Sequence, residues 1–376
     1  MSSSPRWSEV REILGRLLEL PPAERHPAAQ LLCEGDDAMY EEVRSLLAAH
    51  EDGDGLDLMY DRLRNLERTR GHRRRLGEII GGFRVEGLLG EGGMGTVYRA
   101  VGPDGEQVAV KVLRAQGDDA LTQRFQIEQD GMRRLSHPSI GGVRHNGVTA
   151  DGEPFFVTDF VDGQPIDEHL DARRASVVQR VALLTEVCQT VSHAHEMGVL
   201  HRDLKPSNVL VRGDGSHVLL DFGIAKLIEP LAVADPSTLT RQSRVFTPHF
   251  ASPEQAAGEA VSARCDVFSL GVLAYVLTSG RLPVYGEDGT RFDLPRDRAV
   301  LVRLAELRGT TPRRLRNELD DDLQRVLQAA TTIDTDHRTN SVAGLREQLE
   351  RWMSERGGDH RDGWWRWLLP AGFWRA

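Results

Sequence analysis

The chain has 376 residues, of which 40% are hydrophobic and 28% are charged. This is the composition of a globular protein with room for more than one domain. The net charge of −10 argues against a nucleic-acid partner, and the cysteines at positions 33, 188 and 265 form neither a disulfide framework nor a metal-binding motif. We expect a cytoplasmic protein, because the first residues lack the apolar core of a signal peptide and no stretch reaches the roughly 20 apolar residues of a membrane span.

The first 80 residues predict a small helical module and a linker. Apolar residues recur at helical spacing between residues 7 and 18, where a Pro-Pro pair ends the pattern, and again between residues 39 and 47. Residues 1–50 are therefore assigned to a helical N-terminal module. Residues 51–80 lack an apolar period and are interpreted as a linker, whose basic cluster at 70–75 either meets a membrane or nucleic acid or, more simply, is solvated surface.

The next feature is a glycine-rich turn between two predicted strands. In the sequence LLGEGGMGTVYRA, Gly90, Gly92 and Gly95 interrupt a strand pattern, and Val97 follows them. Glycine weakens a strand, but its bare backbone can bring N–H groups close to a phosphate. The pattern fits either a phosphate-binding loop or a glycine-rich hairpin turn, and alone it does not decide between them.

A lysine and a glutamate follow on neighbouring predicted elements. Lys111 ends the sequence Val-Ala-Val-Lys in a predicted strand, and the helix after it carries Glu128 on the same face as Phe125 and Met132. A carboxylate on a buried face needs a cation to keep its charge. We therefore expect Lys111 and Glu128 to pair, which would hold the ammonium where the phosphates of a nucleotide can use it.

Two polar segments come later in the chain, His-Arg-Asp-Leu-Lys-Pro-Ser-Asn at residues 201–208 and Asp-Phe-Gly from Asp221. Their Asp and Asn residues are common in ordinary turns. They also suit a hard divalent cation, because Asn208 and Asp221 supply few enough oxygens that Mg²⁺ would complete its shell with phosphate and water. Asp203 could then accept the proton of an attacking hydroxyl. Together the motifs point to phosphoryl transfer.

In this order, and together with Ser-Pro-Glu at residues 252–254, the motifs resemble those of the eukaryotic-like protein kinases. The sequences GEGGMGTVYRA and TPHFASPEQ are similar to those of the bacterial serine/threonine members. The resemblance implies an α+β fold with two lobes, a β-rich N-lobe at 81–160 and an α-helical C-lobe at 161–353. Residues 354–376 then form a C-terminal tail rich in tryptophan and arginine.

The resemblance also implies roles for individual residues. Asp203 would be the catalytic base, Lys205 would neutralise the γ-phosphate, and Lys111 would grip the α- and β-phosphates of ATP. Asn208 and Asp221 would hold Mg²⁺, with Mn²⁺ as an alternative. The residues expected around ATP and its metal are Gly90, Glu91, Gly92, Gly93, Met94, Gly95, Val97, Ala109, Lys111, Glu128, Thr158, Asp159, Val161, Asn208, Leu210 and Asp221.

A second set of residues is expected to regulate or support the site. Arg202 beside the base is typical of kinases whose activation segment is ordered by a phosphate, and the expected autophosphorylation sites are Thr238, Thr240 and Ser243. A flexible hydroxyl-rich loop would contain the same residues. The residues expected to be structural are Glu128 in the pair with Lys111, Thr247 ahead of the Ser-Pro-Glu motif, Asp266 under the catalytic loop, and Glu254 and Arg338 as an ion pair.

The combined pattern predicts a protein serine/threonine kinase that uses Mg·ATP, phosphorylates protein substrates and acts in bacterial signalling. The alternative is a pseudokinase scaffold, which the presence of Lys111, Asp203, Asn208 and Asp221 disfavours. A phosphotransferase for small molecules shares these residues, but the long segment that ends at the Ser-Pro-Glu motif is typical of a peptide-docking platform.

The C-terminal tail suggests a contact of its own. It contains four of the six tryptophans among arginines, at positions 364, 365, 367 and 374. Aromatic and basic residues together suit a membrane–water interface. The alternatives are packing against the kinase domain or a partner, and disorder, so peripheral membrane association and dimerisation are both left open.

Overall fold

The computed structural model describes residues 13, 17, 22–33, 39–40, 43–44, 75–92, 95–113, 137–222, 249–283 and 293–356. Contacts between Cα atoms divide the chain into two compact units, residues 1–70 and residues 71–376. Several residues singled out in the sequence lie outside the described ranges, namely Gly93, Met94, Glu128, Thr238, Thr240, Ser243, Thr247 and the tail from residue 357 onward.

The N-terminal unit contains a helix that the sequence pattern did not predict. Helix α2 spans Pro22–Leu32 and packs Ala29 and Cys33, the residue after it, against Ile13, Leu17, Met39 and Val43 in a small core. The sequence pattern predicts that the proline pair ends the preceding helix, and in the structure α2 begins at the second proline of that pair. Proline suits the first turn of a helix, because the N–H that it lacks would have no partner there.

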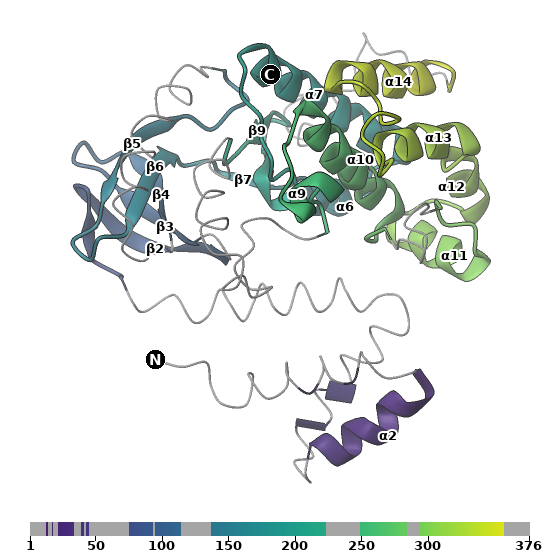
Figure 1. Ribbon diagram of the computed structural model, residues 1–376, viewed down its shortest axis with the longest axis horizontal. Coiled ribbons are helices and arrows are strands. Elements are labelled where there is room, and N and C mark those ends of the chain that lie inside the picture. Colours follow the sequence, from purple (N-terminus) through teal and green to yellow (C-terminus); the bar gives the residue numbers. More distant parts are fainter. Residues whose placement is uncertain are drawn as a thin grey trace, which may run out of the picture. The chain divides into compact units, whose positions relative to one another are not determined.

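The first part of the second unit is a curved antiparallel sheet (Figure 1). Among the described residues its strands are β1 (Ile79–Ile80), β2 (Phe83–Gly92), β3 (Gly95–Val101), β4 (Gln107–Leu113), β5 (Val143–Val148) and β6 (Pro154–Asp159). They are ordered β1-β2-β3-β4-β6-β5. Valines of β4, Tyr98 and Phe155 form much of the core of this lobe, so the β-branched and aromatic residues of the strands face one another across it.

A short antiparallel sheet follows, in the order β7-β8-β9. Its strands are β7 (Gly163–Pro165), β8 (Val209–Arg212) and β9 (His217–Leu219), and a 3₁₀ turn, η2 (Pro206–Asn208), leads into β8. The segment that precedes β5 lies beside β9, because Gly141 donates its backbone N–H to Leu219 and Leu219 donates to Ser139. The small sheet thus connects two polar segments, because residues 201–208 come just before β8 and Asp221 comes just after β9.

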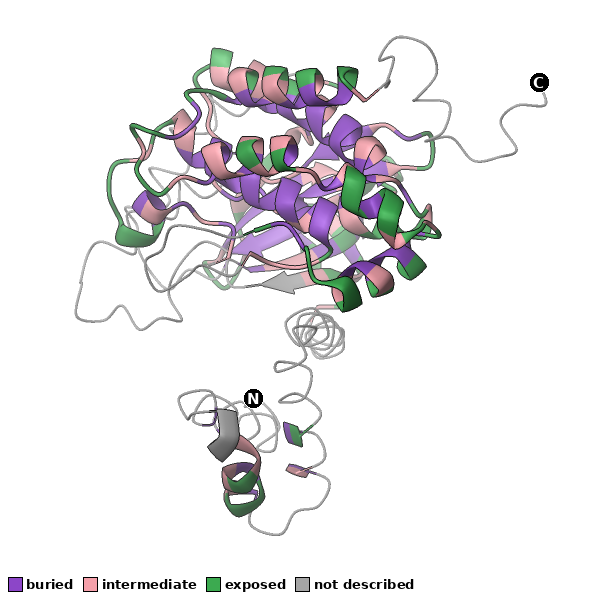
Figure 2. Cartoon of the chain, turned by 90° about the vertical axis from the view of Figure 1, so that its right-hand side faces the viewer, coloured by how far each residue is buried: buried purple, intermediate pink, exposed green. Residues whose placement is uncertain are grey.

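Helices make up the rest of the unit (Figure 1). In the described part of the chain they are α6 (Ile166–Ala172), α7 (Val177–Glu196), α9 (Pro253–Ala257), α10 (Ala263–Ser279), α11 (Arg298–Leu307), α12 (Pro312–Glu318), α13 (Asp321–Ala330) and α14 (Val342–Ser354). Figure 2 shows the buried faces of these helices turned inward and the exposed faces turned outward.

Helix α10 is the centre of the helical lobe. Nearly all of its residues are buried, as expected for a helix that is apolar on all sides. Gly271 allows α13 to approach closely, because a Cβ at this position would lie 2.8 Å from the Cβ of Ala330. The predicted α+β architecture, with a β-rich N-lobe and a helical C-lobe, is confirmed. Within the described residues, no helix combines the length and apolar character of a membrane span.

Candidate active site

A buried ion pair joins the N-lobe sheet to the segment after β9. Lys111 lies on β4, is 8% exposed, and places its Nζ 2.7 Å from Oδ2 of Asp221. Burial by itself would raise the pKa of Asp221, but the charge and hydrogen bond of Lys111 hold it below its ordinary value. Glu128, the expected partner of Lys111, lies outside the described residues, so the partner that the structure gives Lys111 is Asp221.

The segment around η2 forms a second polar cluster. Lys205 places its Nζ 2.8 Å from Oδ2 of Asp203. Asn208 donates through Nδ2 to the carbonyl oxygen of Asp203 at 2.8 Å and to its Oδ2 at 3.0 Å. The backbone carbonyl of Asn208 also accepts from the N–H of Leu220 at 2.9 Å. Because Leu220 precedes Asp221, this bond holds the two polar segments together.

The oxygen donors of this cluster fit a divalent metal that is shared with phosphates. Asn208 uses its amide nitrogen to contact Asp203, which leaves the amide oxygen to serve as a ligand. Asp221 supplies a carboxylate on the neighbouring segment. No group of three or more His, Cys, Asp or Glu side chains within the described ranges could hold a metal on its own. A pair of oxygen ligands is what Mg²⁺ takes when phosphate and water complete its octahedral shell.

Asp266, at the start of α10, accepts backbone N–H groups of the segment at 201–208. Its Oδ1 accepts the N–H of Arg202 at 2.7 Å, and its Oδ2 accepts the N–H of His201 and Nε2 of His195, each at 2.8 Å. The side chain is fully buried, which would raise its pKa, yet these hydrogen bonds and the nearby histidines lower it. Asp266 therefore remains an ionised acceptor in the interior.

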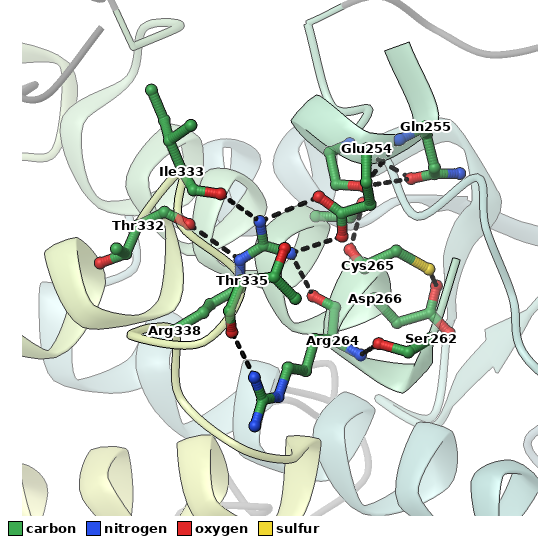
Figure 3. Close-up of polar contacts among 12 residues, drawn as sticks. Glu254, Gln255, Ser262, Arg264, Cys265, Asp266, Thr332, Ile333, Thr335 and Arg338 are labelled. Carbon is green, nitrogen blue, oxygen red and sulfur yellow. Dashed lines mark hydrogen bonds and ion pairs between the residues drawn. The ribbon is translucent and has the colours of Figure 1, made fainter. Parts of the chain in front are cut away.

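A second buried ion pair joins Glu254 of α9 to Arg338 (Figure 3). Arg338 donates through Nη1 to Oε1 of Glu254 at 2.6 Å and through Nη2 to Oε2 at 3.0 Å. The same guanidinium also donates to the carbonyl oxygens of Thr332, Arg264 and Ile333, at 2.9, 2.9 and 3.1 Å. The structure thus places together the two residues that the sequence reasoning expected to pair.

The glycine-rich strands align with Lys111 across the sheet. Gly90 on β2 is opposite Val97 on β3, and Val97 is opposite Lys111 on β4. Gly95 has a second reason to be glycine, because a Cβ there would lie 2.1 Å from the backbone oxygen of Val112. Close packing of β3 on β4 therefore accounts for this glycine without any ligand.

The structure places other residues expected around the nucleotide on β4, β6 and β8 and just after β6. Ala109 on β4 is opposite Thr158 on β6, so the two share one row of the sheet. Val161 is buried just after β6, and Leu210 is partly buried on β8. The side chain of Asp159 forms an ion pair with Arg144 at the surface.

The comparison with known proteins decides the family. Residues 83–349 match the protein kinase domain family. The chain belongs to this family. Its described fold and the motifs in the loops around β4, β8 and β9 are those of a kinase domain.

Curated relatives of this kinase domain are bacterial serine/threonine kinases. The chain is 32% identical over 290 residues to the probable serine/threonine-protein kinase PknB of Lactococcus lactis, covering 74% of this chain and 43% of that protein. It is 34% identical over 283 residues to the kinase Pkn3 of Myxococcus xanthus, covering 73% and 50%. It is 36% identical over 219 residues to PknJ of Mycobacterium tuberculosis, covering 56% and 36%. The chain spans half or less of the length of each relative.

Sequence reasoning missed two residues of the kinase domain that support the 201–208 segment, one through Asp266 and one by direct contact. His195 lies in the last turn of α7 and reaches Asp266. Gln255 lies in α9 and donates through Nε2 to the carbonyl oxygen of Arg202 at 2.9 Å. The spacing Ser-x-x-Gln at residues 252–255 is a signal for the start of a helix, but no local pattern reveals a partner more than fifty residues away.

Proposed function

We propose that this kinase domain transfers the γ-phosphate of Mg·ATP to serine and threonine hydroxyls of proteins, as part of bacterial signalling. The observation that carries the proposal is the connected set of polar side chains between the lobes. Lys111 contacts Asp221, Lys205 and Asn208 contact Asp203, and a backbone bond from Leu220 to Asn208 joins the two groups.

Each side chain has a distinct task in this reaction. Asp203 is 5% exposed and lies beside an ammonium, so its carboxylate would accept the proton of the attacking hydroxyl in a partly desolvated setting. Lys205, 2.8 Å from that carboxylate, would stabilise the negative charge on the transferred phosphoryl group. The protein would then mainly position reactants and stabilise charge.

Lys111 and Asp221 would bind different parts of Mg·ATP, the phosphates and the metal. The ammonium of Lys111 suits the α- and β-phosphates, and the carboxylate of Asp221 with the amide oxygen of Asn208 suits Mg²⁺. When bound, the metal would neutralise phosphate charge. The 2.7 Å contact between Lys111 and Asp221 keeps both charges compensated in the interior when no nucleotide lies between them.

The test is phosphate transfer from γ-labelled ATP, with the labelled amino acids identified after acid hydrolysis. Wild type should label serine or threonine in the presence of Mg²⁺, and labelling should stop when EDTA removes the metal. Asp221→Asn should reduce labelling at least 100-fold, because it removes a charged metal ligand. Asp214→Asn, on the exposed turn between β8 and β9, is the matched control and should keep full activity. Equal labelling by Asp221→Asn and Asp214→Asn would refute the proposal.

A further inference from the structure

The backbone of Arg202, the residue before the proposed base, is held in an unfavourable conformation. Its φ angle is +67°, in the left-handed region that side chains other than those of glycine, asparagine and aspartate rarely adopt. Such a conformation persists only when the surroundings fix it. The peptide groups on either side of Arg202 are both hydrogen-bonded to buried side chains, one through the N–H of Arg202 and the other through its carbonyl oxygen.

The two partners come from different elements. The N–H of Arg202 donates to Oδ1 of Asp266 at 2.7 Å, on α10. The carbonyl oxygen of Arg202 accepts from Nε2 of Gln255 at 2.9 Å, on α9. Asp266 fixes only the peptide group before Arg202. The peptide group that leads into Asp203 is held on both sides: Gln255 donates to its carbonyl oxygen, and its N–H donates to Nδ1 of His201 at 3.3 Å. Gln255 is the partner from outside the 201–208 segment.

The amide of Gln255 is itself fixed in orientation. Its Oε1 accepts from the backbone N–H of Ser252 and from Oγ of Ser252, each at 3.2 Å, in a capping box at the start of α9. Gln255 is 6% exposed. A flipped amide would place its oxygen against the carbonyl oxygen of Arg202 and its nitrogen against the N–H of Ser252, so one orientation satisfies all partners. Gln255 thereby links Ser252, in the Ser-Pro-Glu motif, to the catalytic loop.

We propose that Gln255 is a positioning residue: it holds the left-handed backbone of Arg202 and so sets the orientation of the Asp203 carboxylate toward the acceptor hydroxyl. This inference rests on the proposed kinase function. It also gives the end of the activation segment a direct physical connection to the base, since displacement of Ser252 or α9 would withdraw the amide from Arg202.

The variant Gln255→Glu isolates this contact. It keeps the length of the side chain and an oxygen for the N–H of Ser252, but it replaces the donor to Arg202 by an acceptor. Gln179→Glu is the matched control, because Gln179 makes the same capping box with Ser176 at the start of α7, with Ser176 N to Gln179 Oε1 at 2.9 Å. Gln255→Met, which carries neither donor nor charge, is a second variant in case the glutamate prevents folding.

Two measurements decide the inference. The first is amide hydrogen exchange over residues 198–204, which requires no activity and should speed up about 10-fold or more in either Gln255 variant and not in Gln179→Glu. The second is steady-state kinetics. In the Gln255 variants kcat should fall about 10- to 100-fold, the effect of leaving one buried carbonyl without its donor, while KM for ATP stays within about twofold of wild type.

The outcomes separate the positioning role from a merely structural one. A structural role would lower the melting temperature and the fraction of active enzyme, with kcat per active site unchanged, and that result overturns the inference. Exchange and kcat equal to those of Gln179→Glu would also overturn it. If wild type itself transfers no phosphate, the proposed function fails, and the exchange measurement alone decides whether Gln255 holds Arg202.

Discussion

Removing Arg338 should cost the protein a large part of its stability. Arg338 is 2% exposed and Glu254 is 7% exposed, so the pair is shielded from water. The variant Arg338→Met keeps much of the side-chain volume over Phe268, whose ring centre lies 5.1 Å from Cζ of Arg338, but it removes the charge and every donor. The effect therefore reports on polar contacts more than on packing.

The expected magnitude follows from what the substitution leaves behind. Arg338 makes two hydrogen bonds to the carboxylate of Glu254 and three to backbone carbonyls. Breaking a buried pair by removal of one partner costs about 3–5 kcal/mol, because the remaining charge is uncompensated. We expect a loss in this range for Arg338→Met. Adding Glu254→Gln should recover part of it, since the double variant no longer buries a lone carboxylate.

Denaturant unfolding at pH 7 measures this loss. Arg325→Met is the control, because Arg325 forms an exposed ion pair with Asp322 within α13 and should cost no more than about 1 kcal/mol. Burial raises the pKa of Glu254, but the hydrogen bonds of Arg338 outweigh it and lower the pKa. The stabilisation is therefore present above the unfolded pKa of about 4.3 and is lost as the pH falls below it. A loss under about 1 kcal/mol for Arg338→Met at pH 7 would show that the pair does not stabilise the fold in this way.

Three further predictions concern other residues. Burial, with the nearby His137 and Arg212, lowers the pKa of His217 to about 4. Protonation of His217 should therefore cost up to about 3 kcal/mol of the free energy of unfolding as the pH falls from 6.5 toward 4. In denaturant unfolding at several pH values, His217→Gln should flatten this pH dependence without abolishing it, because burial also lowers the pKa of His169 to about 4. Gly271→Ala should lower the free energy of unfolding by about 1–3 kcal/mol in the same assay, because its Cβ would crowd α13, and this outweighs the higher helix propensity of alanine. Gly344→Ala in α14 is the control: its Cβ would make only ordinary contacts, so it should not destabilise the protein. Lys111→Met should lower phosphoryl transfer at least 100-fold and leave the carboxylate of Asp221 without its cation; a transfer rate within a few-fold of wild type would contradict its role.

Sequence reasoning reached the features that are encoded in short motifs. The strand that carries Lys111 and the segments that carry Asp203 and Asp221 follow from local patterns of apolar, glycine and polar residues, and the two lobes follow from the resemblance of these motifs to those of protein kinases. The contact between Lys111 and Asp221 does not, because it joins residues 110 positions apart through the folding of the two lobes. Tertiary contacts of this kind have no local signal.

Two other features show the same limit. A Pro-Pro pair fits both the end and the beginning of a helix, and the pair alone does not show that α2 begins at Pro22. Gly95 belongs to a motif typical of phosphate binding, yet the backbone of Val112 already requires a glycine there. A sequence motif shows that Gly95 is required, but only its spatial contact with the backbone of Val112 shows a physical reason for the requirement.

The role of Asp203 as the base is tested by the rate of phosphoryl transfer by Asp203→Asn at saturating Mg·ATP, measured together with the affinity of the variant for ATP. The substitution keeps the shape of the side chain and its acceptor oxygen, but it removes the carboxylate that would take the proton from the hydroxyl. With Asp203 as the base, kcat should fall about 10²- to 10⁴-fold while the affinity for ATP changes no more than a few-fold. A variant that transfers phosphate as fast as wild type would contradict this role.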